Sequence, residues 1–120
     1  FQENIMTKKY KIVVGNTVAV LVTGSHTNEG GKAIPFKFTL ICNRLDAADL
    51  KTALGGGETQ VDEFITGVAT GWRDQRLVLE QDDTPAEFCA EALEALLNIS
   101  GLGMLCFTAY MKEAGAKAKN

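Results

Sequence analysis

The sequence contains little histidine or proline and no long apolar run. Its 120 residues include one histidine and two prolines, and no apolar run approaches the ~20 residues that a membrane-spanning helix needs. We therefore expect no membrane contact and no proline-rich linker. A net charge of −3 also argues against a nucleic-acid binder, which normally carries a basic face. The remaining composition, 46% hydrophobic and 22% charged, is typical of a soluble globular protein.

Three cysteines, an odd number, argue against a disulfide framework. Cys42, Cys89 and Cys106 each lie among apolar neighbours, and no two have the C-x-x-C spacing of a zinc site. We expect free, buried thiols in a reducing compartment. An enzyme with a cysteine nucleophile is a competing interpretation. The only histidine, His26, lies in the glycine-flanked segment 24–31, which we interpret as a flexible, exposed connection rather than a fixed catalytic base.

Two further motifs resemble ligand sites without completing one. Gly55-Gly56-Gly57 lacks both the G-K-[ST] ending of a P-loop and the G-x-G-x-x-G of a dinucleotide turn. The acidic stretch 80–87 has no EF-hand pattern. We interpret the glycines as a helix stop with a linker and the acidic stretch as a solvated turn. The sequence therefore predicts no catalytic residue, no cofactor and no metal.

Residues 6–120 are predicted to form a single domain. Residues 1–5 precede Met6 and look like an added remnant or a disordered start, so they are excluded from the fold. Valine and isoleucine are dense over residues 10–22, as is typical of strands. Gly15-Asn16 within that stretch is either a hairpin turn or a bulge.

Residues 34–42 alternate between apolar and polar side chains, which predicts a half-buried strand. Pro35 indicates either that this strand lies at a sheet edge or that the proline lies where the strand begins. The N-terminal third therefore predicts a small antiparallel sheet.

About four helices are predicted after the sheet, which makes the fold class α+β. The second has apolar residues at i, i+3, i+4, i+7 and i+11, from Val61 to Trp72. Thr84-Pro85-Ala86-Glu87 supplies an N-cap, a proline at the first helical position and a glutamate at the third, and so predicts the start of the next. The predicted helices cover residues 45–54, 59–72, 84 to 97 or 99, and 102–114.

The last predicted helix has no charged residue over ten positions, from Leu102 to Met111. Apolar groups on every side require cover nearly all round, which a domain of this size is too small to supply completely. Two interpretations stay open: a central core helix, or a helix with a face left for a partner. On the second interpretation, the predicted partner-binding residues lie on this helix and on the predicted helix over residues 59–72. They are Phe64, Val68, Trp72, Met104, Phe107 and Met111.

Charge is segregated along the chain. Residues 46–94 contain twelve acidic and three basic side chains, whereas the segments on either side are net basic. This pattern favours head-to-tail self-association or an oppositely charged partner. Solvated helix faces are the alternative explanation.

Features over residues 34–120 follow one another in a particular order. The aromatic strand Phe36-Lys37-Phe38 comes first. A helix ending in Gly71-Trp72 is followed by an acidic turn, by Thr84-Pro85-Ala86-Glu87-Phe88, by a final helix with Tyr110 and by a lysine-rich end. In this order of features the C-terminal half resembles the tail assembly chaperones of long-tailed, non-contractile phages related to lambda.

This resemblance implies a non-enzymatic protein of the host cytoplasm that acts during tail morphogenesis. Such chaperones bind the tape measure protein, keep it soluble and help to recruit tail tube subunits. The charge segregation described above makes a homo-oligomer the expectation, and composition and motifs predict no nucleic acid, membrane or cofactor. The alternative is a structural tail component, such as a tail terminator or tube subunit, which would be dominated by strands.

Overall fold

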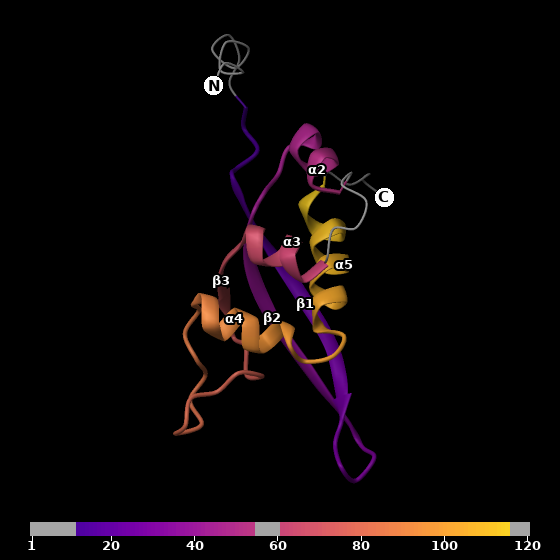
Figure 1. The fold of residues 1–120 in the computed structure, drawn as a ribbon, viewed down its shortest axis with the longest axis vertical. Helices are drawn as coiled ribbons and strands as arrows, with labels where there is room; N and C mark the ends of the chain where they lie inside the picture. The colour runs from indigo at the N-terminus through magenta and orange to yellow at the C-terminus, as the bar shows by residue number, and fades with distance from the viewer. Residues whose placement is uncertain (1–11, 55–60, 116–120) are drawn as a thin grey trace.

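A three-stranded antiparallel sheet and four helices make up the part of the chain that the structure describes, residues 12–54 and 61–115 of a computed structural model (Figure 1). This confirms the predicted α+β class. The motif Gly55-Gly57, the predicted helix start at Thr59 and residues 1–5 lie outside the described residues. In chain order the elements are β1 (Thr17–Thr27), β2 (Ala33–Asn43), α2 (Ala47–Leu54), α3 (Val61–Val68), β3 (Ala69–Arg73), α4 (Ala90–Leu97) and α5 (Leu102–Ala114).

β2 is the central strand and pairs with β1 on one side and β3 on the other. Because side chains alternate along a strand, the register separates two faces. The inner face is apolar and buried: Val20 opposes Leu40 and Val22 opposes Phe38. The outer face carries the intervening residues, such as Leu21, and the β1 residues on this face are exposed.

The helices α3, α4 and α5 pack with the inner face to form the core. Leu96, Ile65 and Cys106, one from each helix, have no exposed surface. α5 makes its main contact with β1 and α3, so it lies over one side of the sheet. α2 buries none of its residues, and Asp46 caps its start because Asp46 Oδ1 accepts the Asp49 N–H at 2.8 Å.

The polar stretch after residue 22 is strand, which makes the predicted flexible connection at 24–31 wrong for its first half. β1 continues to Thr27, and His26 pairs with Ile34. The turn comes later, where the Asn28 side chain accepts the N–H groups of Gly30 and Lys32 and Gly31 has φ +83°. Gly15-Asn16 precedes β1 and is neither a hairpin turn nor a bulge within it.

The second predicted helix is wrong beyond residue 68. α3 ends at Val68, and Ala69–Arg73 forms β3, in which Trp72 lies opposite Leu40. The spacing of Trp72 from Val61 fits a helix, but pairing with β2 places the indole on the apolar inner face instead. Tertiary pairing therefore overrides the helical period here.

The predicted helix start at Thr84 is also wrong, because α4 begins at Ala90. The Asp82 side chain accepts both the N–H and the hydroxyl of Thr84, which holds Thr84 in the turn that precedes Pro85. Pro85 forms an isolated bridge with Leu79 and keeps the segment extended. The cap of α4 is Cys89, whose sulfur accepts the Ala92 N–H at 3.4 Å. Its side chain is exposed, contrary to the expectation that all three thiols are buried.

Within the described ranges, no single helix has the length and apolar character needed to cross a membrane. α4 and α5 reach that composition only when they are taken together, across a bend of 104°.

Candidate partner-binding site

α5 places an apolar stripe on the surface. Its buried side consists of Leu102, Gly103, Cys106 and Tyr110. The adjoining flank of the helix exposes Met104 at 55% and Met111 at 38%, and Phe107 is half-buried between them. Residues at i, i+3 and i+7 share one side of a helix, so these three predicted residues form one surface. We call Met104, Phe107 and Met111 the α5 stripe.

Phe64 and Val68, the two predicted site residues on α3, lie in the core. Their exposed fractions are 6% and 4%, so neither offers much surface to a partner directly. Phe64 supports the α5 stripe from below, because its ring meets that of Phe107 edge to face at 5.4 Å. Such aromatic pairs add about 0.5–1.5 kcal/mol beyond their buried area. Phe64 therefore helps to fix the position of the stripe, whereas Val68 is part of the core.

Two apolar hollows adjoin this region and share Leu45 in their linings. The first, of about 320 Å³, lies between α2 and α3 and is lined by Phe64 and Val68. The second, of about 580 Å³, lies at the C-terminal end of α5 and includes Met111, Leu50 and Val14. The stripe and the two hollows make a partly concave apolar surface, the shape that helix-in-groove recognition uses.

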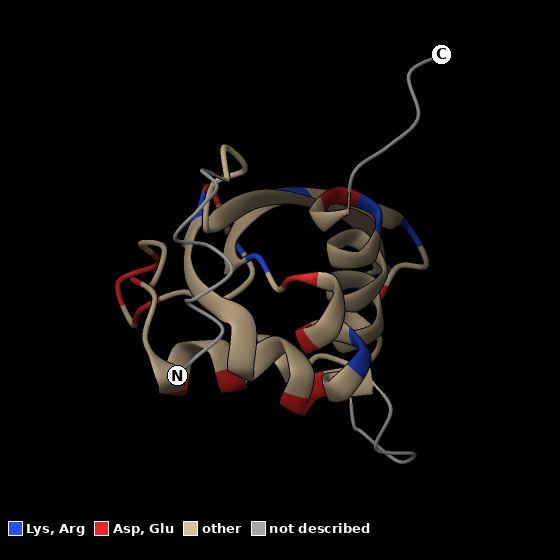
Figure 2. Ribbon diagram, turned by 90° about the horizontal axis from the view of Figure 1, so that it is seen from above, with Lys and Arg blue, Asp and Glu red and all other residues tan. Residues whose placement is uncertain are grey.

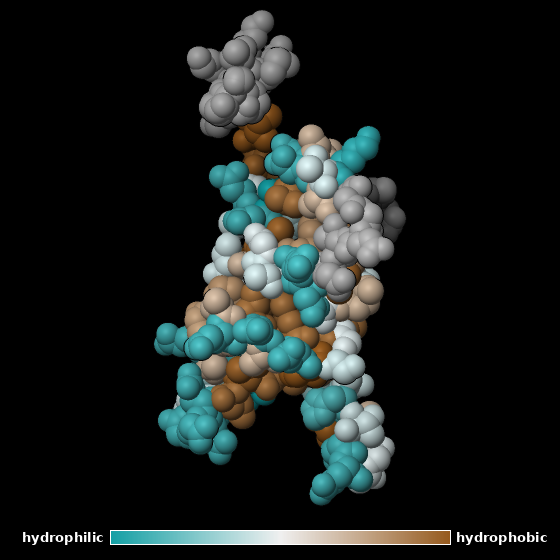
Figure 3. Space-filling model, viewed as in Figure 1, coloured by the Kyte–Doolittle hydropathy of each residue, from teal (hydrophilic) through white to brown (hydrophobic). Residues whose placement is uncertain are grey.

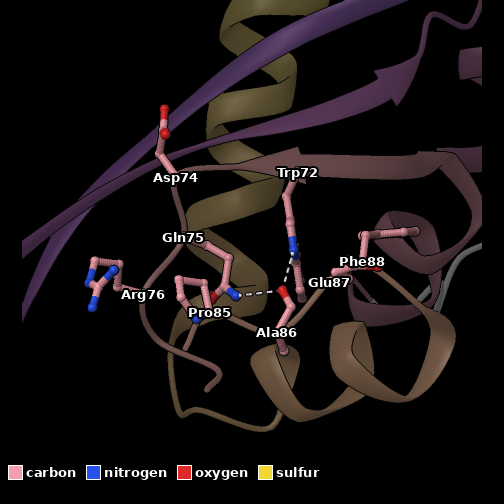
Figure 4. A pocket seen from close by; sticks show the side chains of 8 residues that line it. All are labelled: Trp72, Asp74, Gln75, Arg76, Pro85, Ala86, Glu87 and Phe88. Atoms are coloured by element: carbon pink, nitrogen blue, oxygen red, sulfur yellow. Dashed lines mark hydrogen bonds between the residues drawn. The ribbon is translucent and has the colours of Figure 1, made fainter. Parts of the chain in front are cut away.

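Trp72 lies apart from the other five predicted residues. Its indole N–H donates to the Ala86 carbonyl at 3.1 Å, and its ring meets Phe88 edge to face at 5.2 Å. Figure 4 shows it lining a separate hollow of about 480 Å³ beside Gln75 and Pro85. Trp72 thus belongs to the packing of the 74–89 connection.

Gln75 is the residue that organises this connection, and the sequence analysis did not single it out. It is 2% exposed and its amide nitrogen donates to the carbonyls of Val78 and Ala86. Its oxygen accepts the N–H groups of Leu77 and Val78. A buried amide satisfied at both ends stabilises one loop conformation. All these hydrogen bonds are internal, so Gln75 leaves no polar group directed into the hollow.

Apolar surface gathers over the middle of the helical side of the molecule. Figure 3 shows brown side chains between teal ends in the view that has α3, α4 and α5 in front. A further apolar run, from Ile12 to Val14, is 55–85% exposed and leads to the hollow at the end of α5. The sequence analysis assigned this run to a strand. The run lies before the start of β1, so its β-branched residues are not paired with a strand of the sheet.

The titratable groups in the described part of the chain do not assemble a reactive centre. Burial raises the pKa of Cys42 and of Cys106 to about 12, so neither thiol is ionised at neutral pH. His26 stacks on Phe36 at 6.4 Å in the β1–β2 hairpin. Over residues 12–54 and 61–115, no group of three or more His, Cys, Asp or Glu side chains is gathered closely enough to hold a metal ion.

Comparison with protein-family models, curated proteins and solved structures finds no match to this chain.

Proposed function

We propose that this protein is a phage tail assembly chaperone that binds and solubilises the tape measure protein in the host cytoplasm. The observation that carries the proposal is the α5 stripe. A helix without a charged residue over ten positions exposes two methionines, and one of them, Met111, lines an apolar hollow. The order of sequence features shared with these chaperones supports the same function, and a role in recruiting tail tube subunits follows from that resemblance.

The chemistry of the stripe suits a long helical partner with apolar side chains. Methionine is unbranched and adapts to irregular apolar surfaces, so one stripe can bind successive segments of different sequence. Burial of exposed apolar area contributes roughly 25 cal/mol per Å² before the costs of association. Such binding covers the partner's apolar residues and requires no chemical step, consistent with a protein that is not an enzyme.

The test is co-expression with the tape measure protein of the same phage, measured as the soluble fraction of that protein. Met104→Glu and Phe107→Glu should abolish solubilisation, because each places a charge in an apolar contact. Leu79→Glu is the matched control, since Leu79 is also exposed, at 42%, but lies in the 74–89 connection. Circular dichroism and a thermal melt establish that each variant is folded.

Normal solubilisation by folded Met104→Glu and Phe107→Glu would contradict the assignment of this site. Equal loss in the Leu79→Glu control would show that added charge, and not the stripe, is responsible. A structural tail component is the alternative function, and the uncovered outer face of the sheet is the feature that favours it. Mass spectrometry of purified virions separates the two, because a chaperone is absent from finished tails and a structural component is present.

A further inference from the structure

A cleft separates the β1–β2 hairpin from the 74–89 connection. β1 and β2 stay paired as far as Thr27 and Ala33, beyond the stretch of β2 that pairs with β3. The hairpin and the connection therefore project as two arms, which Figure 3 shows as hydrophilic ends below the apolar centre. The cleft has a volume of about 310 Å³, at the lower end of the range for ligand pockets. This size suits one aromatic side chain with its backbone.

The hairpin side of the cleft is a stack of rings. Phe38, Phe36 and His26 lie on the inner face of the sheet, at neighbouring positions of β2 and β1. The Phe36 ring stacks on Phe38 at 6.4 Å, and the His26 ring stacks on Phe36 at 6.4 Å. Phe38 is buried, Phe36 is half-buried and His26 is exposed. The stack thus runs from the core to the surface and offers its outer end to a further ring.

The opposite side of the cleft carries an unpaired guanidinium. Asp74, Arg76 and Leu77 form this side, and Asp74 turns the chain after β3 with φ +64°. Figure 4 shows Asp74 and Arg76 directed away from Trp72, which lines the neighbouring hollow. Over residues 12–54 and 61–115, the Arg76 guanidinium has no hydrogen-bond or ion-pair partner. Its planar group is therefore available for a carboxylate, which it binds through two parallel hydrogen bonds.

The charge of the cleft favours an anion. Of the described residues that line it, Lys37 and Arg76 are cations and Asp74 is the only carboxylate. The acidic residues of α4, Glu91 and Glu94, lie on the side of the molecule away from the sheet (Figure 2). The cleft is therefore a locally basic site in a chain whose net charge is −3.

We propose that this cleft binds an aromatic residue adjacent to an acidic residue in a segment of a partner polypeptide. The ring packs against His26 and Phe36, and the neighbouring carboxylate pairs with Arg76. Charge complementarity and the open end of the ring stack identify this occupant. The cleft lies between two arms, so a polypeptide can pass through it. The contact uses no residue of the α5 stripe, so it goes beyond the proposed function and does not depend on it.

NMR titration of the isotope-labelled whole chain with capped peptides tests the cleft. A peptide with the central sequence Phe-Asp should shift the amides of Phe36, Arg76 and Leu77 more than those of the α5 stripe. Peptides with Phe-Lys or Ala-Asp in the same frame should bind about tenfold more weakly or worse, because each lacks one of the two contacts. Together the three peptides separate the contribution of the ring from that of the carboxylate.

Three variants of the chain test the residues that line the cleft. Arg76→Glu should weaken binding of the Phe-Asp peptide by about tenfold or more. Arg73→Glu is the matched control, because it makes the same charge change on the outer face of the sheet, opposite Thr39, and should bind like the native chain. Asp74→Asn removes the one carboxylate and keeps the left-handed backbone, which asparagine tolerates, so it should bind the peptide more tightly.

Several results would overturn the proposal. These are a native chain that binds none of the peptides, equal affinity for all three, or amide shifts confined to the α5 stripe. Native-like binding by folded Arg76→Glu, or equal loss in Arg73→Glu, would overturn it as well, because the guanidinium in the cleft would then not be the group that binds the carboxylate. None of these results bears on solubilisation by the α5 stripe.

Discussion

Tyr110 connects the last helix to the end of the sheet through its hydroxyl. The hydroxyl donates to the Asn43 carbonyl at 2.9 Å and accepts the Leu45 N–H at 3.2 Å. The side chain is 1% exposed, and its ring meets Phe64 edge to face at 5.3 Å. A tyrosine buried this deeply needs partners for its oxygen, and here they are backbone groups of the last residue of β2 and of Leu45, which follows it.

We predict that Tyr110→Phe destabilises the protein by about 1–3 kcal/mol, because it leaves the Asn43 carbonyl and the Leu45 N–H without this partner. Urea unfolding followed by circular dichroism measures the change. Thr108→Ala on the exposed side of the same helix is the control and should stay within about 0.5 kcal/mol of the native chain. Equal stability of Tyr110→Phe and the native chain would show that these two hydrogen bonds contribute nothing net.

Arg44 fixes the start of the connection between sheet and helices in a similar way. Its guanidinium donates to the carbonyls of Gly15 and Ala114, one on the stretch before β1 and one at the end of α5. These two carbonyls are distant in sequence, so no local pattern around Arg44 indicates the contact. Hydrogen bonds that single side chains make outside helices and strands, like those of Arg44 and Gln75, are therefore the part of the structure that sequence patterns miss.

At the scale of elements, the sequence correctly predicts those elements whose pattern has a single local cause. β2 alternates because one of its faces is buried and the other is not, and α5 is apolar over three turns because of its own composition. β3 has five residues with no clear alternation, and its conformation depends on pairing with β2. The start of α4 was misplaced because Pro85 pairs with Leu79 in an isolated bridge, a contact between two segments that no local pattern indicates.

For the candidate site, too, sequence patterns predict only what has a local cause. Helical spacing correctly groups Met104 with Phe107 and Met111, and Phe64 with Val68. It does not state whether a shared face meets this chain or another one, and the structure assigns Phe64 and Val68 to the core. Burial by another segment of the chain is a property of the whole fold, so no window of sequence contains it.

Gly24 determines how closely α5 approaches the sheet. A Cβ at this position would lie 2.7 Å from Cζ of Phe36 and 3.0 Å from Cδ1 of Leu105. Phe36 is the cross-strand partner of Gly24, and Leu105 belongs to α5. Because Gly24 has no side chain, Leu105 of the helix and the Phe36 ring of the neighbouring strand can both pack directly against its backbone.

We predict that Gly24→Ala destabilises the protein by about 1–3 kcal/mol through overpacking, although alanine fits an extended backbone. The control is Gly67→Ala on α3, where a Cβ would meet nothing within 4 Å; it should gain up to about 1 kcal/mol from helix propensity. Thermal unfolding of both variants measures the contrast. A Gly24→Ala variant as stable as Gly67→Ala would show that Leu105 and Phe36 move aside at no cost.

At the scale of the whole molecule, the structure separates a stable centre from weakly held ends. The centre is the inner face of the sheet with α5, where Val20, Leu40 and Cys106 have no exposed surface. At one end α2 buries no residue. At the other end the β1–β2 hairpin extends beyond the stretch of β2 that pairs with β3. The α5 stripe lies over the centre, so its geometry is fixed before a partner binds.

We predict that native-state hydrogen exchange follows this division. Amides of β2 from Phe38 to Cys42 and of α5 around Cys106 should exchange most slowly, because only opening of the core exposes them. Amides of α2 and of the hairpin from Ser25 to Ile34 should exchange fastest, because few apolar contacts hold them. Exchange of α5 as fast as that of α2 would contradict a preformed stripe and would mean that its apolar residues become ordered only when they are covered.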